Sequence, residues 1–140
     1  MFEKILLAVD GSEHALKAAR VASNLAKAMN SGTIRIVVAY DPIPPYLGEP
    51  NMQEAINARL DESERILQQA QEVVGEIPGK VEIEQLEGGA AEAILEVAKT
   101  RGSDVIVMGS RGLGKLAGLV LGSTSQKVVS HAPCPVLIVR

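Results

Sequence analysis

The sequence predicts a doubly wound α/β fold, with a five-stranded parallel sheet in the order 3-2-1-4-5 and helices on both faces. Two observations carry this prediction. Short apolar runs alternate with longer segments of helical periodicity along the chain, which is typical of parallel sheets covered by helices. Right-handed crossovers between parallel strands then leave few strand orders. Residues 1–140 are long enough to bury a core and are expected to form a single domain.

A buried strand and an amphipathic helix are expected at the start of the chain. The apolar run 5–9 stops at a turn that begins with Asp10, and a helical pattern follows from Ser12. Its apolar positions recur at three- and four-residue steps, at Leu16, Ala19, Ala22, Ala26 and Met29. Either Ser12 or Asp10 can cap this helix, and Gly32 is expected near its C′ position.

The next three segments are predicted as a strand, a loop and a long helix. Residues 33–40 are rich in β-branched and apolar types and predict the second strand. Residues 41–50 contain four prolines and a glycine, which favours an irregular surface loop. Asn51, followed three residues later by Glu54, resembles a capping box and would begin a helix that reaches about Val74.

The second half of the chain continues the alternation. Residues 80–86 alternate apolar and charged types, as an edge strand with one solvated face does, and residues 90–101 are helical with Gly102 as the stop. The last three elements are expected at 104–109 (a central strand), 123–132 (a short helix) and 135–139 (the final strand).

The final strand is predicted to form an interface between two copies of the chain. In the order 3-2-1-4-5 it lies at a sheet edge, although residues 135–139 are aliphatic and contain no charge. An exposed apolar edge favours pairing with another strand. We therefore expect a homodimer in which this strand pairs with its twofold-related copy.

A ligand is expected in the crevice between the first and fourth strands. In sheets of this type, ligands bind outside the carboxyl ends of the strands, where the winding direction reverses. The first strand ends at Asp10, and the fourth ends at Gly109 in a glycine-rich loop. These two segments, far apart in sequence, should therefore face each other across one crevice.

The composition of the glycine-rich loop favours a phosphate-bearing ligand. Gly109 and Gly112 would let main-chain amides approach oxygen atoms, and Gly122 leads into a helix whose N-terminus favours an anion. The hydroxyl groups that follow would add donors, at Ser123, Thr124 and Ser125. The alternative is that the glycines only make a tight loop.

Charged residues beside the crevice fit the same ligand class. Arg111 and Lys115 would supply cations at the rim. Asp10 could accept hydrogen bonds from ribose hydroxyls or hold a magnesium ion that bridges phosphates. The alternative for Asp10 is a purely structural role as a helix cap.

Neither of two common nucleotide-binding signatures is complete in this sequence. Residues 109–116 fit the opening of the P-loop, but Leu116 stands where that loop needs Ser or Thr to hold magnesium. The dinucleotide pattern G-x-G-x-x-G is absent after the first strand. A phosphoacceptor receiver domain is disfavoured because residues 85–87 contain no aspartate.

Composition disfavours several partners and compartments. A net charge of −3 without a Lys/Arg-rich block argues against nucleic acid and acidic membranes, and no apolar run is long enough to span a bilayer. Cys134 is the single cysteine, which excludes an internal disulfide, and its default role is a buried structural thiol. His14 and His131 are interpreted as surface or helix-end residues. We expect a cytoplasmic protein.

The chain resembles the universal stress protein family over essentially its whole length. The resemblance lies in residues 8–27, 104–112 and 122–139. ATP-binding members of that family have the pattern Gly, two residues, Gly, nine residues, Gly, then Ser or Thr. This sequence has that spacing at Gly109, Gly112, Gly122 and Ser123. The resemblance implies a Rossmann-like, adenine nucleotide alpha hydrolase-like fold, ATP binding and a dimer.

The family's binding residues transfer onto matching positions of this chain. The resemblance implies that Asp10 meets the ribose or a Mg²⁺ or Mn²⁺ ion. The remaining positions are, for the adenine, Ala8, Val9 and Ala39; for the ribose and α-phosphate, Met108, Gly109, Arg111 and Gly112; and for the outer phosphates, Gly122, Ser123 and Thr124. Ala39 departs from the larger aliphatic residue that the family often has.

The sequence therefore favours an ATP-binding regulatory or stress-response protein with no assigned catalytic residue and at most slow hydrolysis. One alternative is an NTP-hydrolysing enzyme that uses Lys115 of the near-match to the P-loop. The other is an interaction module whose crevice binds no nucleotide.

Overall fold

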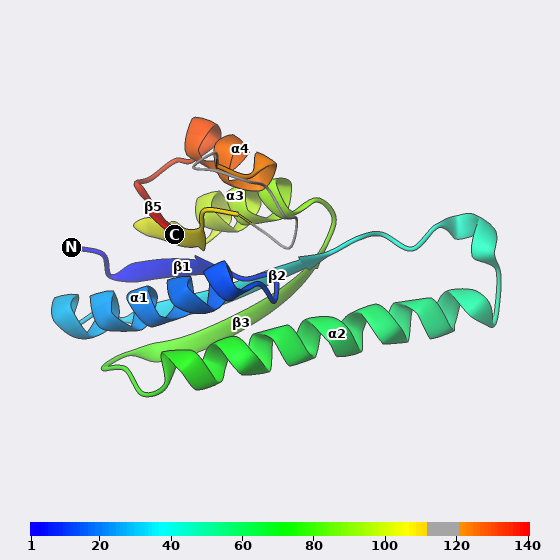
Figure 1. Ribbon diagram of the computed structural model, residues 1–140, viewed down its shortest axis with the longest axis horizontal. Helices are drawn as coiled ribbons and strands as arrows, with labels where there is room; N and C mark the ends of the chain where they lie inside the picture. The colour runs from blue at the N-terminus through cyan, green and yellow to red at the C-terminus, as the bar shows by residue number, and fades with distance from the viewer. Residues whose placement is uncertain (112–120) are drawn as a thin grey trace.

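The computed structural model describes residues 1–111 and 121–140 and confirms the predicted fold (Figure 1). Its parallel sheet has the strand order β3-β2-β1-β4-β5, as expected. The strands are β1 (Lys4–Ala8), β2 (Thr33–Tyr40), β3 (Lys80–Glu87), β4 (Val105–Gly109) and β5 (Val136–Val139). Their bounds agree with the predicted ranges to within a residue or two.

Helices cover both faces of the sheet, as Figure 1 shows. The helices are α1 (Glu13–Met29), α2 (Asn51–Val74), α3 (Ala90–Thr100) and α4 (Ser123–His131), with a 3₁₀ turn, η1 (Pro45–Leu47), between β2 and α2. Helices α1 and α2 pack on one face, and α3 and α4 pack on the other.

Successive side chains of the central strands point to opposite faces of the sheet, which explains why these strands are apolar throughout. In β1, Ile5 and Leu7 belong to the core beneath α1 and α2, whereas Leu6 belongs to the core beneath α3 and α4. Strand β4 repeats this division with Val107 and Ile106. Because both faces are buried, a polar residue at any of these positions would lose its hydration.

The ends of α1 lie close to where the sequence predicts them. Ser12 caps the helix, since its Oγ accepts a hydrogen bond from the amide of Ala15 at 3.2 Å. At the other end, Asn30 is the C-cap and adopts the left-handed conformation with φ of 53°, and Gly32 follows two residues later, near C′ as expected. Asparagine tolerates this region better than most residues, and its backbone amide donates to the carbonyl of Ala26.

The apolar face of α1 is buried except at its end. Ala19, Ala22 and Ala26 are fully buried, while Met29 in the last turn is 42% exposed. Helix α2 begins and ends where predicted, but the capping box does not form. Pro50 occupies the N-cap, and Asn51 is already the first helical residue, so its side chain cannot cap the helix from outside.

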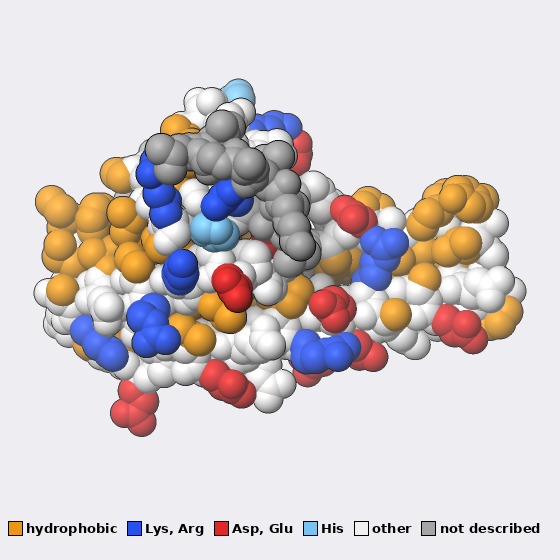
Figure 2. Space-filling model, in the orientation of Figure 1, with side chains coloured by type: hydrophobic (Ala, Val, Ile, Leu, Met, Phe, Trp, Pro, Cys, Tyr) orange, Lys and Arg blue, Asp and Glu red, His pale blue; other side chains and the backbone are white. Residues whose placement is uncertain are grey.

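The connection from β2 to α2 extends beyond the sheet, together with the first turns of α2 (Figure 1). Residues 41–50 are irregular apart from the turn η1, as predicted. Figure 2 shows hydrophobic side chains gathered at this end of the molecule, where Tyr46 is 85% exposed. Across the described residues, no helix is both long and apolar enough to cross a bilayer.

Candidate functional site

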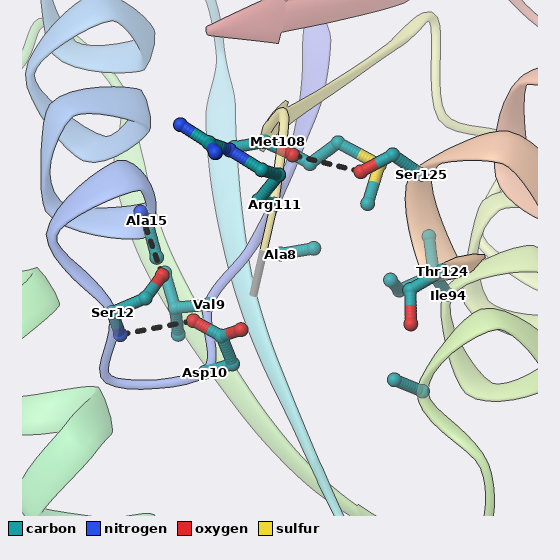
Figure 3. Close-up of a pocket in the computed structure, with 12 residues that line it drawn as sticks. Ala8, Val9, Asp10, Ser12, Ala15, Ile94, Met108, Arg111, Thr124 and Ser125 are labelled. Atoms are coloured by element: carbon teal, nitrogen blue, oxygen red, sulfur yellow. Dashed lines mark hydrogen bonds between the residues drawn. The ribbon is translucent and has the colours of Figure 1, made fainter. Parts of the chain in front are cut away.

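A pocket lies at the carboxyl ends of β1 and β4, where the strand order reverses and a ligand is expected (Figure 3). Strands β1 and β4 form its base, and the first turns of α1, α3 and α4 surround it. Its lining comprises Ala8, Val9, Asp10, Ser12, Ala15, Ala90, Ile94, Met108, Gly109, Arg111, Thr124 and Ser125. We call this the carboxyl-edge pocket.

Most of the predicted site residues come together in this pocket. Eight of them line it, namely Ala8, Val9, Asp10, Met108, Gly109, Arg111, Thr124 and Ser125. Ala39, Gly122 and Ser123 are outside the lining. Ala39 is half-buried near the end of β2, Gly122 is buried, and Ser123 is exposed. Gly112, Lys115 and Leu116 lie outside the described residues.

The pocket lining also contains three apolar residues that the sequence did not predict, namely Ala15, Ala90 and Ile94. They come from the beginnings of α1 and α3. In a parallel sheet, the helix after each strand begins at the edge where that strand ends. Adding the first turn of each predicted helix to the site would therefore have found Ala15 and Ala90.

One carboxylate oxygen of Asp10 is hydrogen-bonded within a turn, and the other is available at the pocket. Its Oδ1 accepts a hydrogen bond from the amide of Ser12 at 2.9 Å, closing a turn in which Gly11 has φ of +87°. No described residue pairs with its Oδ2. Ser12, rather than Asp10, caps α1, so the carboxylate keeps one oxygen available at the pocket.

Ser125 anchors α4 to the end of β4. Its Oγ donates to the carbonyl oxygens of Gly109 at 2.9 Å and Ser110 at 3.1 Å, and the residue is buried. Ser125 also lines the carboxyl-edge pocket, and its contact with a ligand stays a prediction. The amide of Gly122 is also engaged, because it donates to the carbonyl of Ser110 at 2.8 Å.

Gly109 is required by packing between β4 and α1. A Cβ at this position would lie 2.7 Å from the Cβ of His14 and 2.9 Å from its backbone carbon. Both distances are shorter than atoms tolerate. The missing side chain of Gly109 therefore makes room for the first turn of α1, whereas the sequence suggested room for a ligand.

Arg111 turns its guanidinium toward α1. Its Nη2 lies 3.5 Å from Nε2 of His14, and Figure 3 shows the group pointing away from Asp10 and Thr124. His14 is half-buried, and its buried Nδ1 has no hydrogen-bond partner in the described part of the chain. The histidine is thus less exposed than the sequence indicated.

Two helices begin at the pocket without a side-chain cap. Gly89 precedes α3 and Gly122 precedes α4, and neither can supply a capping oxygen. Unpaired amides at a helix N-terminus carry partial positive charge and favour an anion, a role that the Glu92 carboxylate already fills at one amide of α3. Lys127 of α4 pairs with Glu92 in the first turn of α3, and this hydrogen bond holds the pKa of the Glu92 carboxyl below its usual value.

A metal ion in this pocket would be coordinated mainly by oxygen atoms of the bound ligand. Within residues 1–111 and 121–140, no three side chains of the His, Cys, Asp or Glu type gather to hold a metal ion. Asp10 is the one carboxylate in the described lining. A Mg²⁺ ion commonly uses one or two carboxylates together with phosphates and water, so Asp10 fits an ion that arrives with a nucleotide.

Comparisons with known proteins agree on one family. The profile of the universal stress protein family matches residues 1–140. The chain is 49% identical over 140 residues to the universal stress protein in the QAH/OAS sulfhydrylase 3′ region of Thermus aquaticus, and the alignment covers all of both chains.

Solved structures of the same family share the fold. Universal stress protein UspA from Lactobacillus plantarum is 28% identical with a TM-score of 0.86, over 99% of this chain and 98% of that one. A universal stress protein solved in complex with cAMP is 28% identical with a TM-score of 0.68, over 99% and 97% of the two chains.

Proposed function

The chain belongs to the universal stress protein family, and from this premise we propose that it is an ATP-binding member. The nucleotide would occupy the carboxyl-edge pocket and change the partners or the order of the surrounding loops, so that the protein acts as a regulator rather than as a catalyst. The observation that carries the proposal is that the uncapped N-terminus of α4 meets a carboxylate with one unpaired oxygen, that of Asp10, in a largely apolar pocket.

The pocket offers a suitable group to each part of a nucleotide. The apolar wall at Ala8, Val9 and Ile94 suits a base, which gains by leaving water. The free oxygen of Asp10 suits ribose hydroxyls or a Mg²⁺ or Mn²⁺ ion. The amides at the start of α4 and the hydroxyl of Thr124 suit phosphate oxygens.

Arg111 would contribute only after a change of side-chain conformation. In the structure its guanidinium contacts His14 rather than the centre of the pocket. A bound phosphate would compete with His14 for this cation, because hydrogen bonds between two charged groups are stronger than those to a neutral imidazole.

The similar structure in complex with cAMP supports the adenine-nucleotide class. It does not distinguish a cyclic nucleotide from a triphosphate. The helix N-terminus of α4 favours the ligand with the greater phosphate charge, and for this reason we propose ATP.

The test of ATP binding begins with protein purified without added nucleotide. Denaturing it and identifying the released small molecules by mass spectrometry is expected to yield ATP. Calorimetric titrations of nucleotide-free protein should then rank ATP above AMP and cAMP. Absence of heat with all three would contradict the proposal and favour an interaction module. Steady-state turnover that Lys115→Ala abolishes would favour a hydrolase instead.

We also propose that two chains pair through β5. This strand lies at the sheet edge, and Leu137 at its centre is 39% exposed. An edge strand of this kind favours pairing with a second copy. Light scattering at micromolar concentration should give twice the chain mass, and Leu137→Lys should reduce the dimer. A clean 14.8 kDa species in the parent protein would contradict this interface.

A further inference from the structure

A second recess lies at the opposite edge of the sheet, where β1 and β2 begin and α3 ends. We call it the amino-edge recess. It is lined by Lys4, Ile5, Thr33, Arg35, Thr100, Arg101 and Ser103. Three of these residues are cationic and three bear hydroxyl groups. The carboxyl-edge pocket does not share any of them.

Arg35 is an exception within its strand. Its neighbours Ile34 and Ile36 are fully buried, yet Arg35 stands between them with a side chain that is 20% exposed. It lies on the face covered by α3 and α4, beyond the end of α3. Arginine at such a position is rare unless it is paired.

Arg35 shares its carboxylate partner with a second guanidinium group. Its Nη1 donates to Oε1 of Glu84 at 2.7 Å, and Nε of Arg101 donates to the same oxygen at 3.0 Å. Two guanidinium groups therefore share one carboxylate. Arg35 and Glu84 are largely shielded from water, with 20% and 18% of their side chains exposed, whereas the side chain of Arg101 is 53% exposed and carries its charge at the rim of the recess.

The other charged groups at the recess are exposed to solvent. The ammonium of Lys4 donates to the carbonyl of Arg101 at 3.4 Å and adds a third cation. The nearby acids Glu82, opposite Arg35 in the strand register, and Asp104, which accepts from the amide of Lys4, are both exposed to solvent. Water screens these exposed carboxylates, and it likewise screens the exposed cations Lys4 and Arg101.

The donors that remain are suited to a phosphate group. A guanidinium has five N–H donors, and each of the two uses one on Glu84. The hydroxyls of Thr33 and Ser103 lie in the same lining. Paired guanidinium groups with an ammonium are a common arrangement for phosphate oxygens.

We propose that the amino-edge recess binds the phosphate group of a small anionic metabolite, independently of the nucleotide at the carboxyl edge. Glu84 acts as a positioning residue that holds the two guanidinium groups side by side. The ligand's oxygens accept hydrogen bonds from the guanidinium donors that Glu84 leaves unused.

Titration of the ¹⁵N-labelled protein with inorganic phosphate and with pyrophosphate, at constant ionic strength, tests the proposal. We expect saturable shifts of the amides of Lys4, Thr33, Arg35 and residues 100–103. The variant Arg101→Gln should weaken binding by about tenfold, which corresponds to about 1.4 kcal/mol. The matched control Lys99→Gln changes an exposed cation of the same helix outside the recess and should leave the affinity within about twofold.

Several outcomes would overturn the proposal. The amides of the recess could fail to respond, or Arg101→Gln could bind as the parent does. Equal shifts with sodium chloride would indicate only general ionic screening. Circular dichroism separates a folding defect from lost binding, and Lys4→Gln, at an exposed position, provides a second variant with the same expected loss. Loss of phosphate binding with normal ATP binding would leave the proposed nucleotide function intact.

Discussion

The two edges of the sheet present different chemistry although strand β1 contributes to both. At the carboxyl edge, backbone groups dominate: helix N-termini, a tight turn at Asp10 and an apolar wall. At the amino edge, side chains dominate, with Arg35, Arg101 and Lys4 around one shared carboxylate. The fold itself creates the first arrangement, whereas the second depends on residues that the fold does not require.

This difference has a consequence for prediction from sequence. A site built from backbone is found once the strand order is known, because every parallel doubly wound sheet places helix N-termini at that edge. A site built from side chains is found only when residues such as Arg35 and Glu84, 49 positions apart, are known to meet.

The largest effects are expected where glycine permits close packing. At the amino edge, a Cβ on Gly79 would lie 2.1 Å from the carbonyl oxygen of Gly32, which is backbone and cannot turn aside. We expect Gly79→Ala to lower the free energy of unfolding by about 1 to 3 kcal/mol. Gly109→Ala, at the carboxyl edge, should fall in the same range because its Cβ would meet α1.

Urea denaturation measures both changes, and Gly32→Ala is the control. A Cβ on Gly32 would meet the end of the Glu3 side chain, which is exposed and can rotate. Its cost should therefore be below about 0.5 kcal/mol. Equal losses in all three variants would show that close backbone packing is not the cause.

The next effect separates the two roles of Asp10. Asp10→Asn keeps an oxygen that can accept from the amide of Ser12 but removes the charge, whereas Asp10→Ala removes both. Both variants should weaken ATP binding about tenfold in the presence of Mg²⁺. Only Asp10→Ala should also lower the unfolding free energy, by about 1 kcal/mol.

Calorimetry with Mg²⁺-ATP and urea denaturation provide the two readouts for Asp10. Phosphate binding at the amino edge should be unaffected in both variants. Parent-like ATP affinity in Asp10→Asn would show that the carboxylate serves the turn alone.

A smaller effect concerns the thiol near the amino edge. Burial chiefly, with a contribution from the carboxylate of Asp104, raises the pKa of Cys134. The folded protein then holds this proton at a pH where the unfolded chain has begun to lose it. The thiol's contribution to stability should therefore be complete at neutral pH and decline as pH rises above about 8.5.

Alkylation rates between pH 7 and 10 test this prediction for Cys134. Iodoacetamide should react more slowly with the folded protein than with the chain in urea. Asp104→Asn should speed the reaction slightly, since one of the two causes is removed. Equal rates in folded and unfolded protein would contradict a raised pKa.

The smallest effect lies between the helices at the carboxyl edge. Lys127 lowers the pKa of Glu92, so this ion pair contributes stability above the carboxyl's usual titration range and loses it as pH falls through the lowered pKa. An NMR titration of Glu92 should give a midpoint below 4.5 that rises in Lys127→Gln. An unchanged midpoint in that variant would exclude Lys127 as the cause.

Much of the fold was predictable because hydrophobic periodicity is a local property. The apolar runs gave the strands, and the strand order followed from general rules of crossover handedness. The differences lie at helix ends. Asn30, two residues before Gly32, took the left-handed position, which asparagine tolerates. Pro50, one residue before Asn51, took the N-cap position although proline has no capping oxygen.

The candidate site was predictable in location but less so in detail. Asp10 and Thr124 were brought together by topology alone. The roles of Gly109 and Ser125 were not predictable, because each depends on a contact with another element. Gly109 packs against His14 of α1, and Ser125 donates to the carbonyl of Gly109 in β4. Such contacts have no local signal in the sequence.

Mapping Mg²⁺-ATP onto the ¹⁵N-labelled protein tests the central claim most directly. If the nucleotide binds at the carboxyl edge, the largest amide shifts will fall on residues 8–12, on Ala90 and Ile94, and on residues 123–125. Shifts confined to Lys4, Arg35 and Arg101, or no saturable shifts at all, would contradict nucleotide binding where the strand order reverses.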